Sequence, residues 1–286
     1  MLIFIYRRAK RQRKETKGED FLKKQTVIYF TDELNDEFSK AKITPKFIGD
    51  DYKYIRTSFF DKITRVFWYR IIFTPLAAFY SKFIARQKIV NKRLLKKFKH
   101  TGYFLYGNHT HDLGDALIPH FTNFPKHNYI IVHPNNVSMP FLGRLTPYLG
   151  ALPLPDTMGA YKNFVSAIDK RIKEKKCIIV YPEAHIWPYY TKIRPFGDVS
   201  FAYPQRLDVP AFCFTNTYHK RRFSKKPRVI TYVDGPFYPN TSLPKKEQRK
   251  HLRDQIYECM CERASLSTYE AIKYERATEK KEDVND

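Results

Sequence analysis

The sequence has few cysteines, and they lack the spacing that zinc or thiol-redox motifs use. The four, Cys177, Cys213, Cys259 and Cys261, include no Cys-x-x-Cys pair. Cys177 and Cys213 lie inside apolar runs, where a free thiol behaves as a small hydrophobic side chain. The pattern excludes a disulfide scaffold and predicts a reducing, intracellular compartment.

Long apolar runs are also missing. No stretch of about 18 or more uninterrupted apolar residues occurs, so no transmembrane helix is predicted. The apolar stretch Met1–Tyr6 is too short for the core of a secretory signal, and no basic residues precede it. We therefore expect a chain that is not secreted. Internal repeats and low-complexity blocks are absent from the sequence as well.

Acidic residues are scarce: 29 aspartates and glutamates stand against 52 lysines and arginines, which gives a net charge of +23. A field of this sign attracts phosphates and acidic lipid headgroups, so an anionic partner is expected. Composition alone leaves nucleic acid and a membrane surface both open. Residues 7–24 form a polybasic arm that is either a solvated tail or a contact to anionic lipid.

The segment from Phe59 to Ala85 is rich in aromatic and aliphatic residues with interspersed lysines and arginines. Pro75 is expected to break it into two short helices, an amphipathic hairpin. Such a hairpin suits the headgroup region of a membrane, and a hairpin buried against the core is the alternative. Residues 82–99 follow with eight basic and no acidic residues, which favours an electrostatic clamp on anionic lipid.

From Gly102 onward, strand-like and helix-like patterns alternate. Apolar runs rich in Ile, Val and aromatic residues predict five buried strands, at 103–106, 129–132, 177–181, 210–214 and 229–233. Phe164, Ile168 and Ile172 recur at helical spacing after a cap at Asp156 or Thr157, and a second helix is expected over 245–263. The predicted fold is α/β: a mostly parallel central sheet flanked by helices, preceded by the helical hairpin.

The strongest chemical signal is the run from Tyr106 to Ala116, where two histidines and two aspartates follow the first strand. A histidine serves as a general base when a carboxylate fixes its tautomer and stabilises the imidazolium. His109 is the candidate base, and Asp115 its partner, with Asp112 as the alternative orienting carboxylate. The pair meets only if His109 precedes the helix, because six helical residues place positions 109 and 115 on different faces.

A metal site is the competing interpretation of the same run. His109, His111 and Asp115 could form a hydrolytic metal cluster, but the sequence has no later group of histidines and carboxylates at ligand spacing. We therefore expect no metal and no other cofactor.

A second reactive block follows another strand. Glu183 in Tyr181-Pro182-Glu183 could accept hydrogen bonds from a substrate hydroxyl or neutralise an arginine, and Lys192 and Arg194 could bind phosphate. A solvated charged loop is the alternative for this block. Loops that follow neighbouring parallel strands share one edge of the sheet, where α/β folds bind ligands.

Taken in order, four blocks resemble the glycerophospholipid acyltransferase family of the 1-acyl-glycerol-3-phosphate acyltransferase type. They are Asn108-His109 through Asp115, Gly143-Arg144-Leu145 through Pro153, Tyr181-Pro182-Glu183, and Val209-Pro210-Ala211. The chain differs from the family pattern in three places: one extra residue separates His109 from Asp115, Ala184-His185 replaces Gly-Thr, and no arginine follows Pro155-Asp156. Arg144, Lys192 and Arg194 are the candidate replacements for that arginine.

The resemblance implies transfer of a fatty acyl group from acyl-CoA or acyl-carrier protein to the hydroxyl of a lysophospholipid, by default 1-acyl-glycerol-3-phosphate. His109 would be the general base, Asp115 its partner, and Glu183 an acceptor-binding group. The expected site is the cytoplasmic face of an anionic membrane, bound peripherally or monotopically, with no nucleic-acid partner. The alternatives are a metal-dependent hydrolase and a non-enzymatic basic membrane- or nucleic-acid-binding protein.

On this interpretation the chain has four parts. Residues 1–58 form a basic, partly mobile region, and residues 59–100 a membrane-interfacial helical segment with a basic linker. Residues 101–263 form the acyltransferase domain, and residues 264–286 a charged tail.

Overall fold

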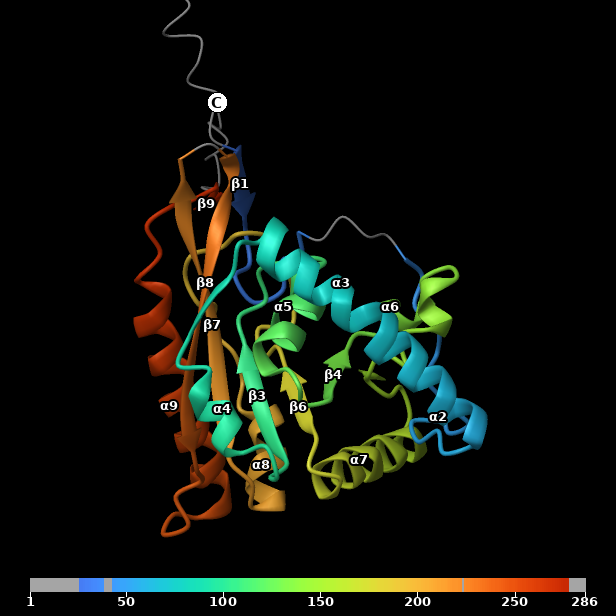
Figure 1. Cartoon of the computed structure of the whole chain (residues 1–286). Coiled ribbons are helices and arrows are strands. Elements are labelled where there is room, and N and C mark those ends of the chain that lie inside the picture. Colours follow the sequence, from blue (N-terminus) through green and yellow to red (C-terminus); the bar gives the residue numbers. More distant parts are fainter. Residues whose placement is uncertain (1–25, 39–42, 223, 278–286) are drawn as a thin grey trace, which may run out of the picture.

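The computed structural model describes residues 26–38, 43–222 and 224–277. Its main feature is a seven-stranded sheet in the order β2-β8-β7-β3-β6-β4-β5 (Figure 1). The strands are β2 (Lys88–Val90), β3 (Tyr103–Gly107), β4 (Asn128–Val132), β5 (Ala151–Pro153), β6 (Cys177–Val180), β7 (Ala211–Arg221) and β8 (Ser224–Phe237). All neighbouring pairs are parallel except β7 with β8.

The centre of the sheet is β3, whose five residues are all buried. Its side chains alternate between two cores, as the period of two along a strand requires. Phe104 and Tyr106 pack on one face with α7 (Met158–Lys173) and α9 (Lys245–Ala264), while Tyr103 and Leu105 pack on the other face near α4 (Arg93–Lys97). Helices therefore cover both faces, and the predicted α/β class is confirmed.

Each of the five predicted strands overlaps a strand of the sheet, but the sequence underestimates the length of two of them. Apolar content marks only the start of β7 and the middle of β8, whereas the strands continue outward as a long antiparallel hairpin that ends in polar and basic residues. The short edge strands β2 and β5, of three residues each, were not predicted. Of the two residues predicted to cap α7, Asp156 or Thr157, the structure uses Thr157. Its side chain accepts a hydrogen bond from the backbone N–H of Ala160.

The segment 59–85 forms one helical run in place of the predicted hairpin. It joins α2 (Phe59–Arg65), π-helical turns at Val66–Phe73, α3 (Thr74–Phe79) and π-helical turns at Tyr80–Ile84. The backbone N–H of Thr74 bonds to the carbonyl of Tyr69, five residues back. A π turn of this kind absorbs an interruption in the helical ladder, which lets the run pass through Pro75 without a break.

Small and polar groups of this run face the protein, and Tyr69 anchors it. The Tyr69 hydroxyl accepts a hydrogen bond from the backbone N–H of Asn128 at 2.7 Å, and its ring stacks on His127 with centroids 3.7 Å apart. The Thr74 hydroxyl and His120 Nε2 are 2.9 Å apart, which connects the run to α5 (Gly114–Asn123). The run is therefore fixed to the sheet domain through its middle.

The opposite face of the run is apolar and exposed. Its exposed side chains are Phe59, Phe60, Ile63, Val66, Phe67, Ile71, Ile72, Leu76, Phe79, Phe83 and Ile84. A contiguous apolar surface of this extent is unusual for a surface that faces only water. Within the described residues, no helix has the length and hydropathy to cross a bilayer.

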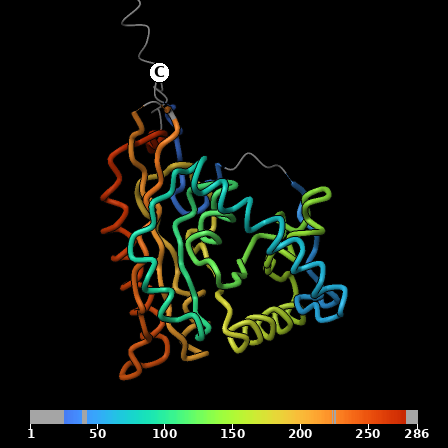
Figure 2. Tube along the Cα trace, in the orientation of Figure 1, coloured from blue at the N-terminus to red at the C-terminus, as the bar shows by residue number. Residues whose placement is uncertain are grey.

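The charged tail contains a strand that the sequence did not predict. Ile272–Arg276 (β9) pairs in parallel with Thr26–Phe30 (β1), so segments from the two ends of the chain lie side by side (Figure 2). The predicted polybasic arm at 7–24 and the last part of the predicted tail, from 278, lie outside the described residues.

We expect acid to destabilise the anchor of the helical run. Burial lowers the pKa of His120 from 6.5 to about 4, and burial lowers the pKa of His127 as well. The unfolded chain therefore binds a proton that the folded chain does not, and stability falls as the pH drops from about 6.5 toward about 4. For His120 alone, the loss between about pH 7 and about pH 5 is about 2 kcal/mol.

Urea unfolding at the two pH values measures this loss. His120→Gln removes the titrating group, so the pH dependence should shrink by about that amount, whereas His100→Gln at an exposed histidine should leave it unchanged. An equal pH dependence in the wild type and in His120→Gln would contradict the prediction.

Candidate active site

The end of β3 is locked to β7 before the reactive residues begin. The Asn108 side-chain amide donates to the carbonyl of Asn216 at 3.0 Å, and its oxygen accepts from the backbone N–H of Asn216 at 2.8 Å. At Gly107 a Cβ would lie 2.2 Å from the Phe214 ring, so only glycine allows this approach. The loop that carries His109 therefore leaves the sheet at a fixed position.

His109 and Asp115 meet in the structure. His109 Nδ1 lies 2.7 Å from Asp115 Oδ2, and the same oxygen accepts the backbone N–H of His111 at 3.0 Å. Asp115 is the second residue of α5, so His109 precedes the helix as the pairing requires. The extra residue between the two is taken up in the turn before α5. The alternative carboxylate, Asp112, lies exposed in that turn.

The surroundings of the pair define which ring nitrogen remains open. Asp115 is buried, while the His109 side chain retains 17% of its exposure. The imidazole stacks on the Tyr181 ring, with centroids 4.5 Å apart. An ionised carboxylate at Nδ1 holds the proton on that nitrogen, which leaves the lone pair of Nε2 available to a substrate.

Glu183 lies behind His109 and contacts its backbone. One carboxylate oxygen accepts the His109 N–H at 3.1 Å and the other accepts the Arg194 N–H at 3.1 Å. Burial raises the pKa of Glu183, against the lowering effects of the Arg194 charge and the two N–H donors. Glu183 follows β6 and His109 follows the adjacent β3, so this carboxylate ties the two loops together.

The three predicted phosphate-binding cations lie in different surroundings. Arg194 is fully buried: its guanidinium is 3.6 Å from the Glu183 carboxylate, donates to the carbonyl of Glu183, and lies over the Trp187 ring. Lys192 is exposed in the loop after β6. Arg144 is exposed in the connection between β4 and β5. The structure thus pairs Arg194 with Glu183. A role of Arg144, Lys192 or Arg194 in acceptor binding stays a prediction.

A segment for which sequence reasoning made no structural prediction covers the second loop. Trp187 Nε1 donates to the carbonyl of Asp36 at 2.7 Å, and the Phe38 N–H donates to the carbonyl of Ile186. The Tyr274 hydroxyl donates to the carbonyl of Pro188. Residues 26–38 and 272–276 therefore pack over the loop that holds Glu183. The β-branched and aromatic run Thr26–Phe30 was the available signal for a strand in this segment.

His111, the third member of the alternative metal cluster, has a buried ring that packs against Tyr189 and Tyr218. Its burial lowers its pKa, and its Nε2 contacts no hydrogen-bond partner in the described part of the chain. Among residues 26–38, 43–222 and 224–277, one group places three ligand atoms within 4.8 Å of one another, namely Cys213, Asp234 and Cys259. Both oxygens of Asp234 there accept hydrogen bonds from Arg263.

Comparison with known proteins relates this fold to an acyltransferase. The chain resembles the crystal structure of the 1-acyl-sn-glycerophosphate (LPA) acyltransferase PlsC from Thermotoga maritima, with a TM-score of 0.50 and 15% sequence identity. The match covers 73% of this chain and 81% of that one. No family model and no curated protein sequence matches the chain. At this identity the likeness establishes a common fold.

A double-mutant cycle tests the buried pair of Glu183 and Arg194. Arg194→Met should reduce the free energy of unfolding by about 3–5 kcal/mol, because it leaves the Glu183 charge buried without its cation. Adding Glu183→Gln should recover part of that loss. Urea unfolding measures all four proteins, with the exposed pair Lys250→Met and Asp254→Asn as the matched control. Additive losses at 183 and 194 would show that the two side chains are not coupled.

Proposed function

We propose that this protein is an O-acyltransferase that moves a fatty acyl group from a thioester to the hydroxyl of a lysophospholipid. The observation that carries the proposal is the 2.7 Å contact between His109 Nδ1 and Asp115 Oδ2. The pair follows the central strand of a fold shared with an LPA acyltransferase. The order of the four motif blocks along the sequence supports the same activity.

In the proposed reaction, His109 Nε2 removes the proton from the acceptor hydroxyl. The resulting oxygen attacks the thioester carbonyl, a carbon–oxygen bond forms, and the carbon–sulfur bond breaks. The imidazolium then returns its proton to the departing thiolate, so the thiol and the new ester are the products. Asp115 stabilises the imidazolium between these steps, and its burial strengthens that effect. The donor is acyl-CoA or acyl-carrier protein.

Glu183 and Arg194 are assigned to positioning in this proposal. Both are buried, and the Glu183 carboxylate accepts the His109 backbone N–H. Together they hold the base in position at the edge of the sheet. Lys192 is the exposed cation of the same loop and is proposed to face the acceptor phosphate. The default acceptor is 1-acyl-glycerol-3-phosphate, and no other headgroup is favoured by a specific contact.

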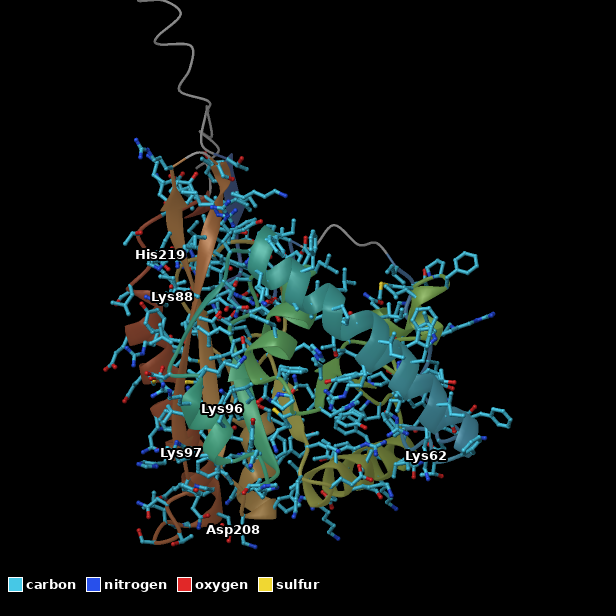
Figure 3. All side chains as sticks on the ribbon, in the orientation of Figure 1. Lys62, Lys88, Lys96, Lys97, Asp208 and His219 are labelled. Atoms are coloured by element: carbon cyan, nitrogen blue, oxygen red, sulfur yellow. The ribbon has the colours of Figure 1, made fainter. Side chains whose placement is uncertain are left out.

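We also propose that the protein works on the cytoplasmic face of an anionic membrane. The exposed apolar face of the helical run is the surface that would enter the headgroup region. Lys96 and Lys97 on α4 are exposed and could contact acidic headgroups (Figure 3). Lys92 is less available, because its ammonium donates to the carbonyl of Phe121 at 3.0 Å and lies over that residue's ring.

His109→Gln should reduce acyl transfer by about 10²–10⁴-fold, because no group remains to accept the hydroxyl proton. Asp115→Asn should reduce it as well, since the amide favours the wrong imidazole tautomer. Thiol release from acyl-CoA in the presence of lysophosphatidic acid measures the rate, and circular dichroism checks the fold. His100→Gln, at an exposed histidine, is the matched control. Near-wild-type turnover in His109→Gln would sink the assignment.

Replacing Phe79 and Phe83 by serine should weaken binding to lipid vesicles, because both rings are more than half exposed on the helical run. Sedimentation with anionic vesicles measures the bound fraction. The control replaces Met158 and Val199 by serine, since these apolar residues are at least as exposed and lie on other elements. Similar vesicle binding by the wild type and both variants would contradict the assignment of the helical run as the membrane contact.

A further inference from the structure

A cavity lies between residues 46–56 and the connection from β4 to β5, apart from the loop that carries His109. It has a volume of about 320 Å³ and is formed by residues 46–56 and 137–148. Its lining includes three cations, Lys46, Arg56 and Arg144, and two tyrosines, Tyr52 and Tyr148. No carboxylate lines it. The cavity therefore joins positive charge with phenol groups in one place.

The cations of this cavity have no carboxylate partners. None of the three forms an ion pair with any residue that the structure describes. The nearby Asp61 carboxylate accepts hydrogen bonds from Ser58 and from the Tyr148 hydroxyl and is attracted by the Arg56 charge, so it offsets one of these three charges. Net positive charge thus remains in the cavity for an external anion.

Two neighbouring polar groups of the cavity wall also have no hydrogen bond of good geometry. The Tyr52 hydroxyl and Arg56 Nε are buried and reach no acceptor or donor of good geometry among the described atoms. Burial raises the pKa of Tyr52, against a lowering by the adjacent Arg56 charge, so the phenol keeps its proton to donate. Buried donors of this kind are normally satisfied, and an anionic oxygen would satisfy both.

The walls of the cavity are held in place by contacts with each other and with Asp156, just after β5. The Lys46 N–H donates to Ser138 Oγ at 2.8 Å, and the Ile48 N–H donates to the Asp156 carboxylate at 2.7 Å. At Gly143 a Cβ would lie 2.5 Å from the carbonyl oxygen of Val137, so the floor is closely packed. A preformed site avoids part of the ordering cost of binding.

We propose that this cavity is a binding site for a phosphate ester, held by Arg56, Arg144 and Lys46. Arginine forks match phosphate oxygens in pairs, and lysine adds a point charge. His109 follows β3, and three strand spacings separate β3 from β5, about 14 Å. A lysophospholipid whose hydroxyl lies at His109 is therefore not the expected occupant. The ligand is either the headgroup of a bilayer phospholipid or a phosphate of the thioester donor.

The test compares two triple variants that remove the same charge. Lys46→Gln, Arg56→Gln and Arg144→Gln together empty the cavity of cations. Lys245→Gln, Lys246→Gln and Lys250→Gln remove three charges from exposed positions of α9, which packs on β7 and β8 toward the opposite end of the sheet. Full-length protein is titrated calorimetrically with CoA, and separately sedimented with phosphatidylcholine vesicles with and without phosphatidic acid.

The cavity triple should bind at least one of these probes about tenfold more weakly than the control triple does. A loss with CoA identifies a donor phosphate, and a loss only with phosphatidic acid vesicles identifies a lipid headgroup. Equal affinities of the two triples for both probes would overturn the proposal. The variant Lys46→Gln with Arg144→Gln, at two exposed positions, keeps the test valid if Arg56 is needed for folding.

The phosphate site itself does not rest on the acyl-transfer proposal, whereas the thioester donor as its ligand does. His109→Gln should retain the affinity of the wild type for the probe, whatever its turnover. Loss of turnover with intact binding, or the reverse, therefore separates the two assignments.

Discussion

The geometry of the candidate site depends on one buried carboxylate that ties two strand ends together. Glu183 accepts the backbone N–H of His109 with one oxygen and that of Arg194 with the other. Both donors belong to loops that follow neighbouring parallel strands, and the backbone N–H groups of Trp187 and Tyr189 join these loops further by donating to the carbonyls of His109 and Thr110. Arg194 balances the charge inside the protein. The position of the imidazole is thus determined by the interior and not by solvent-exposed contacts.

Asp115 acts on the same histidine from the other side. Its Oδ2 faces Nδ1, and the His111 N–H meets that oxygen as well. Backbone and side chain of His109 are consequently held by two different carboxylates, one from the β6 loop and one from α5. Tyr181 adds a ring against the imidazole. Contacts to both the backbone and the side chain fix the orientation of the imidazole, as a general base requires if Nε2 is to face the substrate hydroxyl.

Most of the central sheet could be predicted from sequence because its strands are continuous apolar runs such as Tyr103–Tyr106. The pairing partner of His109 could not be decided, since the choice between Asp112 and Asp115 depends on where α5 begins. Pro75 led to a wrong prediction. Local propensity favours a break in the helix at this proline, whereas the π-helical turns let the helical run continue through it. The pairing of Thr26–Phe30 with Ile272–Arg276 is a contact between distant segments, which periodicity within either segment cannot reveal.

The turn between His109 and Asp115 carries a wider consequence. The two side chains meet because the turn closes before the helix starts, so helical phase does not set their distance. The number of residues in such a turn can then change during evolution while the two atoms stay in contact. A sequence motif that requires a fixed number of residues between the histidine and the aspartate is therefore more restrictive than the contact itself requires. Related chains with longer or shorter turns would share this arrangement and still escape recognition by that motif.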